Sequence, residues 1–222
     1  MDIALIIIIL LILVAEFVNG WTDAPNSIAT VVSTRVMTPG QAVIMATILN
    51  AIGAFSGTAV ARTIGTGIVQ PEAVTLVIIG SAMVGIILWS SLTYIFGGLP
   101  TSESHALIAG LTGAALATAG PSALLWTGWK KVLLGLVFST FLGFCLGLLI
   151  TLVIYRLFAN YHSGPVRRGF GRLQILSSAF VAFSHGNNDG QKFIGVFTLS
   201  LFLGGIIPEF KVPFWVILVC AV

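Results

Sequence analysis

Charged residues are scarce in this chain of 222 residues: Asp, Glu, Lys and Arg make up only 8% of it, whereas 57% of its residues are hydrophobic. Soluble domains carry about 25% charged residues, so the composition excludes an ordinary soluble protein. Only two cysteines occur, Cys145 and Cys220, and both lie in apolar runs, where we expect buried thiols without a disulfide. The net charge of +3 is mostly scattered as single charges, which argues against a nucleic-acid partner.

Long apolar runs are present instead, and several reach about the 20 residues needed to cross a bilayer. The first run, residues 3–14, has no polar side chain and follows the acidic Asp2, so we interpret it as a retained helix rather than a signal peptide. The sequence therefore predicts an all-α, polytopic integral membrane protein, placed in the plasma (inner) membrane and surrounded by the lipid bilayer. The predicted spans are 3–18, 42–61, 73–96, 131–158, 193–207 and a run that begins near residue 212.

Two stretches, FVNGWTDAPNSIA at 17–29 and FSHGNNDGQKFIG at 183–195, form an internal repeat. Phe17, Gly20 and Asp23 recur 166 residues later as Phe183, Gly186 and Asp189. Three predicted spans lie between the copies, so the copies would have opposite orientations, as in many secondary transporters. We expect residues 1–160 to form a first repeat, residues 161–171 a cytoplasmic linker marked by nearby arginines, and residues 172–222 an incomplete second repeat.

Polar residues and helix breakers mark the places where these helices should be interrupted. Gly20 and Pro25 predict a break within the protein interior, where free N–H groups attract an anion and free carbonyls suit a cation. Acids inside a membrane indicate function by default, which favours roles for Asp23 and Asp189, although each could also cap a helix. Both interpretations are equally open for Glu16 and Glu103, which lie in or beside the predicted breaks.

A third polar segment, GLPTSESHALIAG at 98–110, opens the short apolar run 101–119, which predicts a re-entrant or broken helix. Its hydroxyls, with the N–H groups of a first helical turn, suit a tetrahedral oxyanion, or they form an ordinary capping box. His105 alone would more often be an interior histidine than a ligand. Lys192 could pair with Asp189 or extend toward the membrane surface. The hydroxyl residues are Thr101, Ser102 and Ser104.

The motifs NGWTDAPNSIA, PTSESHALIAG and SHGNNDGQKFIG, in this order, resemble those of the inorganic phosphate transporter family over most of the chain. The resemblance implies a secondary active transporter that imports inorganic phosphate by symport with a cation, which we expect to be sodium rather than a proton. It implies no cofactor. The residues expected to bind phosphate are Asp23, Asn26, Thr101, Ser102, Ser104, His105, Asn188, Asp189 and Lys192, and those expected to bind sodium are Asp23, Asn26, Asn188 and Asp189.

The sequence departs from the family pattern in two ways. Lys192 stands where the repeat would place the counterpart of Asn26, and no second Pro-x-Ser-x-x-His element occurs before residue 222. We therefore expect a second chain or a missing segment to complete the second repeat. Gly-rich helix faces would also permit a homodimer.

Three other functions are compatible with parts of the pattern. The first is a permease for sulfate or another tetrahedral oxyanion. A passive channel would need rings of like groups, whereas these motifs are asymmetric. An intramembrane enzyme is disfavoured because Ser104 and His105 are adjacent, and neighbouring helical residues point about 100° apart.

Overall fold

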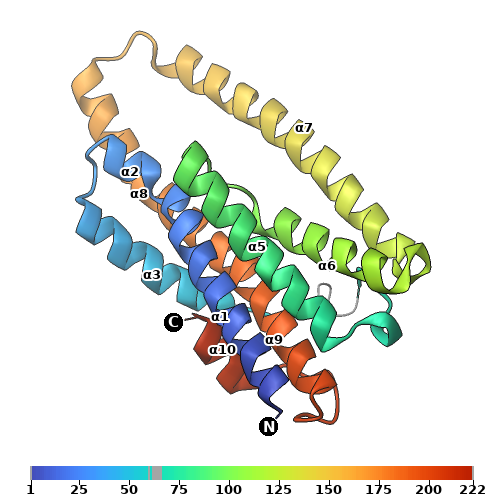
Figure 1. Ribbon diagram of the computed structural model, residues 1–222. Coiled ribbons are helices and arrows are strands. Elements are labelled where there is room, and N and C mark those ends of the chain that lie inside the picture. The colour runs from blue at the N-terminus through green and yellow to red at the C-terminus, as the bar shows by residue number, and fades with distance from the viewer. Residues whose placement is uncertain (1, 60, 62–66, 222) are drawn as a thin grey trace.

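The protein is a bundle of helices, seen in a computed structural model that describes residues 2–59, 61 and 67–221 (Figure 1). No β-strand occurs among these residues, so the predicted all-α class is confirmed. Three segments are long and apolar enough to cross a membrane, namely Ile3–Ser27, Leu76–Gly97 and Trp126–Phe158. Cys145 and Cys220 are both free, as expected.

The first predicted break is present at Pro25. Helix α1 (Ile3–Thr22) starts at Asp2, whose carboxylate accepts a hydrogen bond from the Ala4 N–H. The chain then tightens into the 3-10 turn η1 (Ala24–Ser27) and resumes as the short helix α2 (Ala29–Ser33). Proline has no N–H and its ring crowds the preceding turn, so α1 cannot continue through Pro25. Gly20 lies inside α1 rather than at the break.

The next two helices start or end a few residues away from their predicted bounds. Helix α3 (Pro39–Phe55) opens with a capping box and is shorter than the predicted span 42–61, part of which falls outside the described residues. Helix α5 (Leu76–Gly97) follows the 3-10 turn η2 (Pro71–Ala73), which takes up the beginning of the predicted span 73–96.

The segment after α5 turns back into the molecule. Gly98 has a positive φ of 60°, a conformation that glycine adopts at little cost, and it ends α5. The chain then returns to the middle of the molecule, where α6 (Glu103–Ala119) begins and packs against α5 (Figure 1). Helix α6 has 17 residues and is not among the three membrane-length segments, which agrees with the short helix predicted at 101–119.

Helix α7 (Trp126–Phe158), which follows the turn η3 (Pro121–Ala123), lies at the edge of the bundle and buries only Gly128 (Figure 1). Its apolar surface suits contact with lipid. Helix α8 (Ser163–His185) begins almost at once, so most of the expected linker 161–171 is helical. The linker arginines Arg167 and Arg168 lie on the first turns of α8.

The second copy of the repeat is not broken, contrary to the expectation of two interrupted helices. Helix α8 passes through the π-helical turn η4 (Gly186–Gly190) directly into α9 (Gln191–Leu203). The residue 166 positions after Pro25 is Gln191, which keeps its N–H, so nothing forces the helix to end. A π turn instead widens the helix locally.

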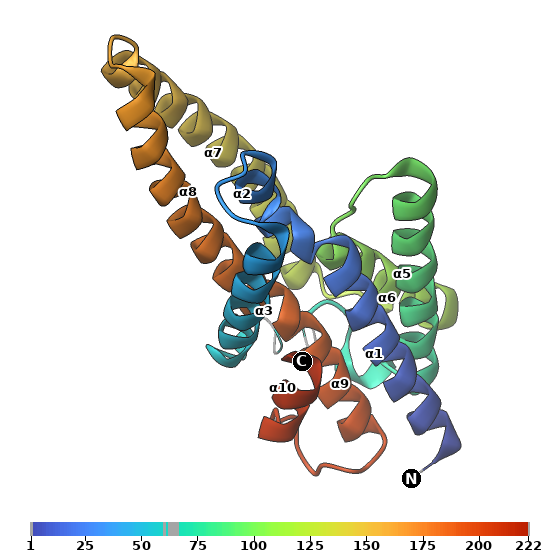
Figure 2. The same ribbon diagram turned by 90° about the vertical axis from the view of Figure 1, so that its left-hand side faces the viewer.

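Helix α9 is the centre of the bundle, because every residue from 191 to 201 is buried. It packs against α1, α5 and α10 (Phe214–Ala221). Figures 1 and 2 show α1 and α9 running in opposite directions. This arrangement agrees with the inverted repeat, which itself stays a prediction, as do the repeat boundaries.

Close backbone contact holds the π turn against α3. A Cβ atom at Gly186 would overlap the backbone of Asn50, and one at Gly53 would meet the carbonyl of Phe183 and lie 2.7 Å from the backbone nitrogen of Asn187. No side chain fits at either glycine. Helix α3 therefore fixes the position of η4, and with it the side chains that η4 carries.

Gly186→Ala and Gly53→Ala are expected to destabilise the protein by about 1–3 kcal/mol each, the usual cost of overpacking. Gly135→Ala is the matched control, because Gly135 is also helical and a Cβ there would meet nothing within 4 Å. Thermal unfolding in detergent, followed by tryptophan fluorescence, measures the difference. Equal melting temperatures for all three variants would show that the contact between α3 and η4 is not tight.

Candidate functional site

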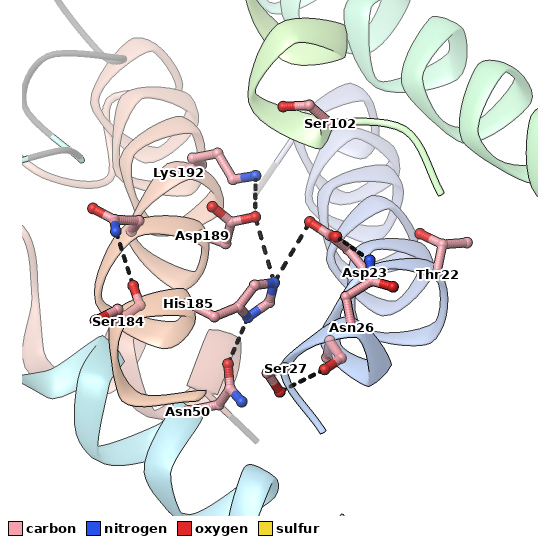
Figure 3. Close-up of polar contacts among 12 residues, drawn as sticks. Thr22, Asp23, Asn26, Ser27, Asn50, Ser102, Ser184, His185, Asp189 and Lys192 are labelled. Atoms are coloured by element: carbon pink, nitrogen blue, oxygen red, sulfur yellow. Dashed lines mark hydrogen bonds and ion pairs between the residues drawn. The ribbon is translucent and has the colours of Figure 1, made fainter. Parts of the chain in front are cut away.

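Two acids that are 166 residues apart in the sequence come together around one histidine. His185 Nε2 lies 3.6 Å from Asp23 Oδ2 and 3.6 Å from Asp189 Oδ2 (Figure 3). Asp23 stands at the break between α1 and η1, whereas Asp189 lies in the π turn. The ligand atoms of the three residues all lie within 4.8 Å of one another, a spacing that a cation could bridge. We refer to Asp23, His185 and Asp189 as the carboxylate–histidine cluster.

The orientation of the His185 ring is fixed from α3. Its Nδ1 lies 2.6 Å from Asn50 Oδ1, and Asn50 Nδ2 donates to the carbonyl of Ala46 at 2.8 Å. Because the amide oxygen can only accept, Nδ1 carries the proton in this pair. Nε2 is buried, lacks a hydrogen bond among the described residues, and points between the two carboxylates. A neutral ring would thus present a lone pair to the space between them.

Each acid also has a partner three residues further along the chain. Asn26 Nδ2 donates to Asp23 Oδ1 at 2.9 Å, and Lys192 Nζ lies 2.9 Å from Asp189 Oδ2 (Figure 3). The Lys192 side chain is only 1% exposed. Of the two alternatives for Lys192, the structure therefore has the pairing with Asp189 and not an extension toward the membrane surface.

Two asparagines of the π turn have different surroundings. Asn187 Oδ1 accepts hydrogen bonds from Ser56 Oγ at 2.7 Å and from Gln191 Nε2 at 2.8 Å, which ties the turn to the end of α3. Asn188, predicted to bind both phosphate and sodium, is exposed and donates to the carbonyl of Ser184 at 2.9 Å. The structure therefore does not bring Asn188 into the carboxylate–histidine cluster.

The start of α6 faces the cluster through Glu103. This side chain is completely buried, neither of its oxygens has a hydrogen bond in the described part of the chain, and it lies within electrostatic reach of Lys192, Asp23 and Asp189. A buried carboxyl without partners is costly, so it indicates a role beyond packing. Ser102 precedes it as the N-cap of α6.

The remaining predicted anion ligands surround Glu103 with mixed exposure. Ser102 Oγ accepts from the backbone N–H of His105 at 3.5 Å, a long cap that leaves the exposed hydroxyl free to donate. Thr101 Oγ1 lies 3.4 Å from Thr93 Oγ1 of α5. Ser104 is partly buried, whereas the side chain of His105 is exposed. Figure 3 shows Ser102 at the α6 start beside the cluster.

An open cavity of about 670 Å³ lies on the α3 side of the cluster, between α1, α3, η4 and α10. His185 and Asn50 line it, as do Glu16 and Asn19 of α1. Glu16 Oε2 and Asn19 Oδ1 are buried without a hydrogen bond among the described residues. His185 thus touches both the cavity and the carboxylate pair, which makes the cavity a route by which small ions could approach the cluster.

Sequence reasoning found both acids but missed two residues that organise them. His185 was quoted within the second motif, and its position four residues before Asp189 places the two on the same helical face. That spacing could have identified it. Asn50 lies in an apolar run that carries no such signal, and only the packing of α3 against η4 brings it to the ring.

A model of the phosphate transporter family matches residues 19–222 of the sequence. The chain belongs to the phosphate transporter family. A "probable low-affinity inorganic phosphate transporter" of Rhizobium meliloti (strain 1021) is 44% identical over 207 residues, which cover 92% of this chain and 62% of that protein. A protein of the same name from Bacillus subtilis (strain 168) is 36% identical over 227 residues, covering 100% of this chain and 68% of the relative. The chain therefore spans about two thirds of the length of these relatives.

The fold is also found in a solved structure of "the sodium-dependent phosphate transporter". The TM-score is 0.79, the sequence identity is 24%, and the match covers 99% of this chain and 73% of that one. This likeness supports the arrangement of the helices. As members of this family are transporters, the prediction that the protein is not an enzyme is confirmed, as is its place in a membrane.

His185→Phe is expected to destabilise the protein by about 1–3 kcal/mol, because it keeps the ring volume but leaves Asn50 Oδ1 and two neighbouring carboxylates without their partner. Asn188→Ala is the control from the same turn, since its bond is local and exposed. Thermal unfolding in detergent compares the two variants. An Asn188→Ala variant as unstable as His185→Phe would contradict the central position of the histidine.

Proposed function

We propose that the carboxylate–histidine cluster is the coupling site of a symporter that imports inorganic phosphate together with a cation. The observation that carries this proposal is the meeting of Asp23 and Asp189, from two separate parts of the chain, around His185 inside an apolar bundle. Ionised carboxylates in a membrane interior cost several kcal/mol, and they mark ion pathways. A mobile cation between them would lower that cost during part of the transport cycle.

The phosphate would bind at the start of α6, next to the cluster. The first-turn N–H groups of a helix and its positive dipole end attract anions, and Ser102 adds a hydroxyl donor. Lys192, within electrostatic reach of Glu103, supplies a positive charge on the same side. Of the predicted anion ligands, Thr101, Ser102, Ser104 and Lys192 therefore have the more favourable placement. His105 and Asn188, which are exposed, have no such support.

We assign the coupling cation to Asp23, with sodium as the preferred ion. Asp23 and the oxygen of Asn26 offer hard ligands, and the end of α1 offers free carbonyls. The name of the structural neighbour, the sodium-dependent phosphate transporter, agrees with this choice. A proton is the second candidate, favoured by two buried groups that can titrate, His185 and Glu103.

Asp23→Asn is expected to abolish gradient-driven uptake of labelled phosphate into proteoliposomes, because the amide keeps the shape but loses the charge that holds the cation. Imposing a sodium gradient and a pH gradient in separate reactions identifies the ion. Arsenate should compete with phosphate, and sulfate should not, because sulfate carries no proton to donate to an acceptor carboxylate. Uptake by Asp23→Asn at the wild-type rate would remove Asp23 from coupling, and preferred transport of sulfate would overturn the substrate.

Ser102→Ala is expected to weaken phosphate binding about tenfold to a hundredfold, the equivalent of roughly 1.5–3 kcal/mol for one hydrogen bond to a charged ligand. Ser104→Ala should act in the same direction, and neither should change the steepness of the cation dependence. Ser139→Ala serves as control, because Ser139 is an exposed hydroxyl on α7 bonded to its own helix. A Ser102→Ala protein with unchanged affinity, but less stable by about 1 kcal/mol, would mean that the hydroxyl only caps α6.

A further inference from the structure

The two copies of the repeat place the same contact at the same spacing with different chemistry. In the first copy the carboxylate of Asp23 receives the side chain of Asn26 at 2.9 Å. In the second copy the carboxylate of Asp189 receives the side chain of Lys192, also at 2.9 Å. Asn26 and Lys192 are themselves 166 residues apart, so they are counterparts in the repeat. A neutral amide and a full positive charge thus occupy equivalent positions.

Lys192 is held in a way that fixes its charge in place. Its side chain is 1% exposed, at the start of the fully buried stretch 191–201 of α9. A buried ammonium is rare in proteins unless it is paired, and Asp189 is the acid in direct contact with it. Glu16 of α1 and Glu103 of α6 are also within reach of its field. Removing such a pair's cation would leave an uncompensated buried carboxylate.

Asp23 has no equivalent fixed charge at contact distance. Its side chain is 23% exposed, its hydrogen-bond partner Asn26 is neutral, and the His185 nitrogen stands 3.6 Å away, shared with Asp189. Lys192 acts on Asp23 only beyond contact distance. The first copy therefore has an acid that a mobile cation can reach, whereas the acid of the second copy is already neutralised.

We propose that Lys192 is a tethered cation that fills the second of two equivalent cation positions, so that only the Asp23 position takes up and releases an ion. This inference rests on the proposed function for its transport consequence, but the occupancy of the two positions is a property of binding alone. The residue three positions after each acid would then determine how many cations accompany each phosphate. Asn at that position leaves a site for a mobile ion, and Lys closes it.

The binding test uses purified protein and sodium, with choline as the matched cation at equal ionic strength. Asp23→Asn should remove the rise in melting temperature that sodium produces, because it removes the open position. Adding Lys192→Asn to that variant should restore a sodium-dependent rise, since Asp189 then resembles the wild-type Asp23. Asp23→Asn with Lys192→Arg is the control and should stay insensitive to sodium. A double variant with Lys192→Asn that is equally insensitive would overturn the proposal.

The transport test uses the same substitutions in proteoliposomes. Lys192→Asn should raise the Hill coefficient for sodium in phosphate uptake by about one, as expected when one further site must fill. Lys192→Arg should leave it unchanged. Asn26→Lys is the mirror variant, and it should make phosphate binding independent of sodium even if the Lys192 variants fold poorly. An unchanged Hill coefficient in Lys192→Asn, with sodium dependence retained in Asn26→Lys, would overturn the proposal.

The two proposals fail in different ways. Wild-type protein that shows no cation-driven phosphate uptake would contradict the proposed function, and the melting experiment would still decide the role of Lys192. Wild-type uptake that is coupled to sodium, with Lys192→Asn indistinguishable from Lys192→Arg in both experiments, would contradict only the tethered cation.

Discussion

Compensation of buried charge is the constraint on which the rest of this structure depends. The interior of the bundle is apolar, yet it contains the carboxylates of Asp23 and Asp189, and an ionised carboxylate is stable there only when it is paired or hydrogen-bonded. His185 is shared by both acids, and Lys192 neutralises one of them. The imbalance that remains at Asp23 gives the protein a reason to bind a cation, and a positively charged site next to α6 gives it a reason to bind an anion.

Two different distortions of helical structure bring these charges together. Pro25 ends α1 and leaves Asp23 at a helix terminus, whereas the π turn lets α8 and α9 run on as one rod while it carries Asp189 and its neighbours toward α1. The close approach of Gly186 to the backbone of Asn50 then sets the depth at which His185 stands. A mobile first copy beside a rigid second one suits a site that must open and close around an ion.

The sequence was sufficient to predict the membrane class, most of the spans, the break at Pro25 and the short helix after Ser102, because these follow from local composition and from proline and glycine chemistry. It did not predict that the second copy stays helical, although Gln191 in place of proline was a local sign of it. The role of Asn50 could not be predicted, since it depends on how α3 packs against η4. Asn188 shows the reverse case: its motif position suggested a ligand, whereas its side chain bonds to the backbone of Ser184.

The central claim is that Asp23 and Asp189 act as one unit through His185, and a double-mutant cycle tests it most directly. Equilibrium binding of labelled phosphate, in the presence of the coupling cation, would be measured for the wild type, Asp23→Asn, Asp189→Asn and the double variant. The account predicts strongly non-additive losses, with an interaction energy of about 1–3 kcal/mol, as found for residues that share one network. Losses that add to within about 0.5 kcal/mol would show that the two acids are independent and would contradict the account.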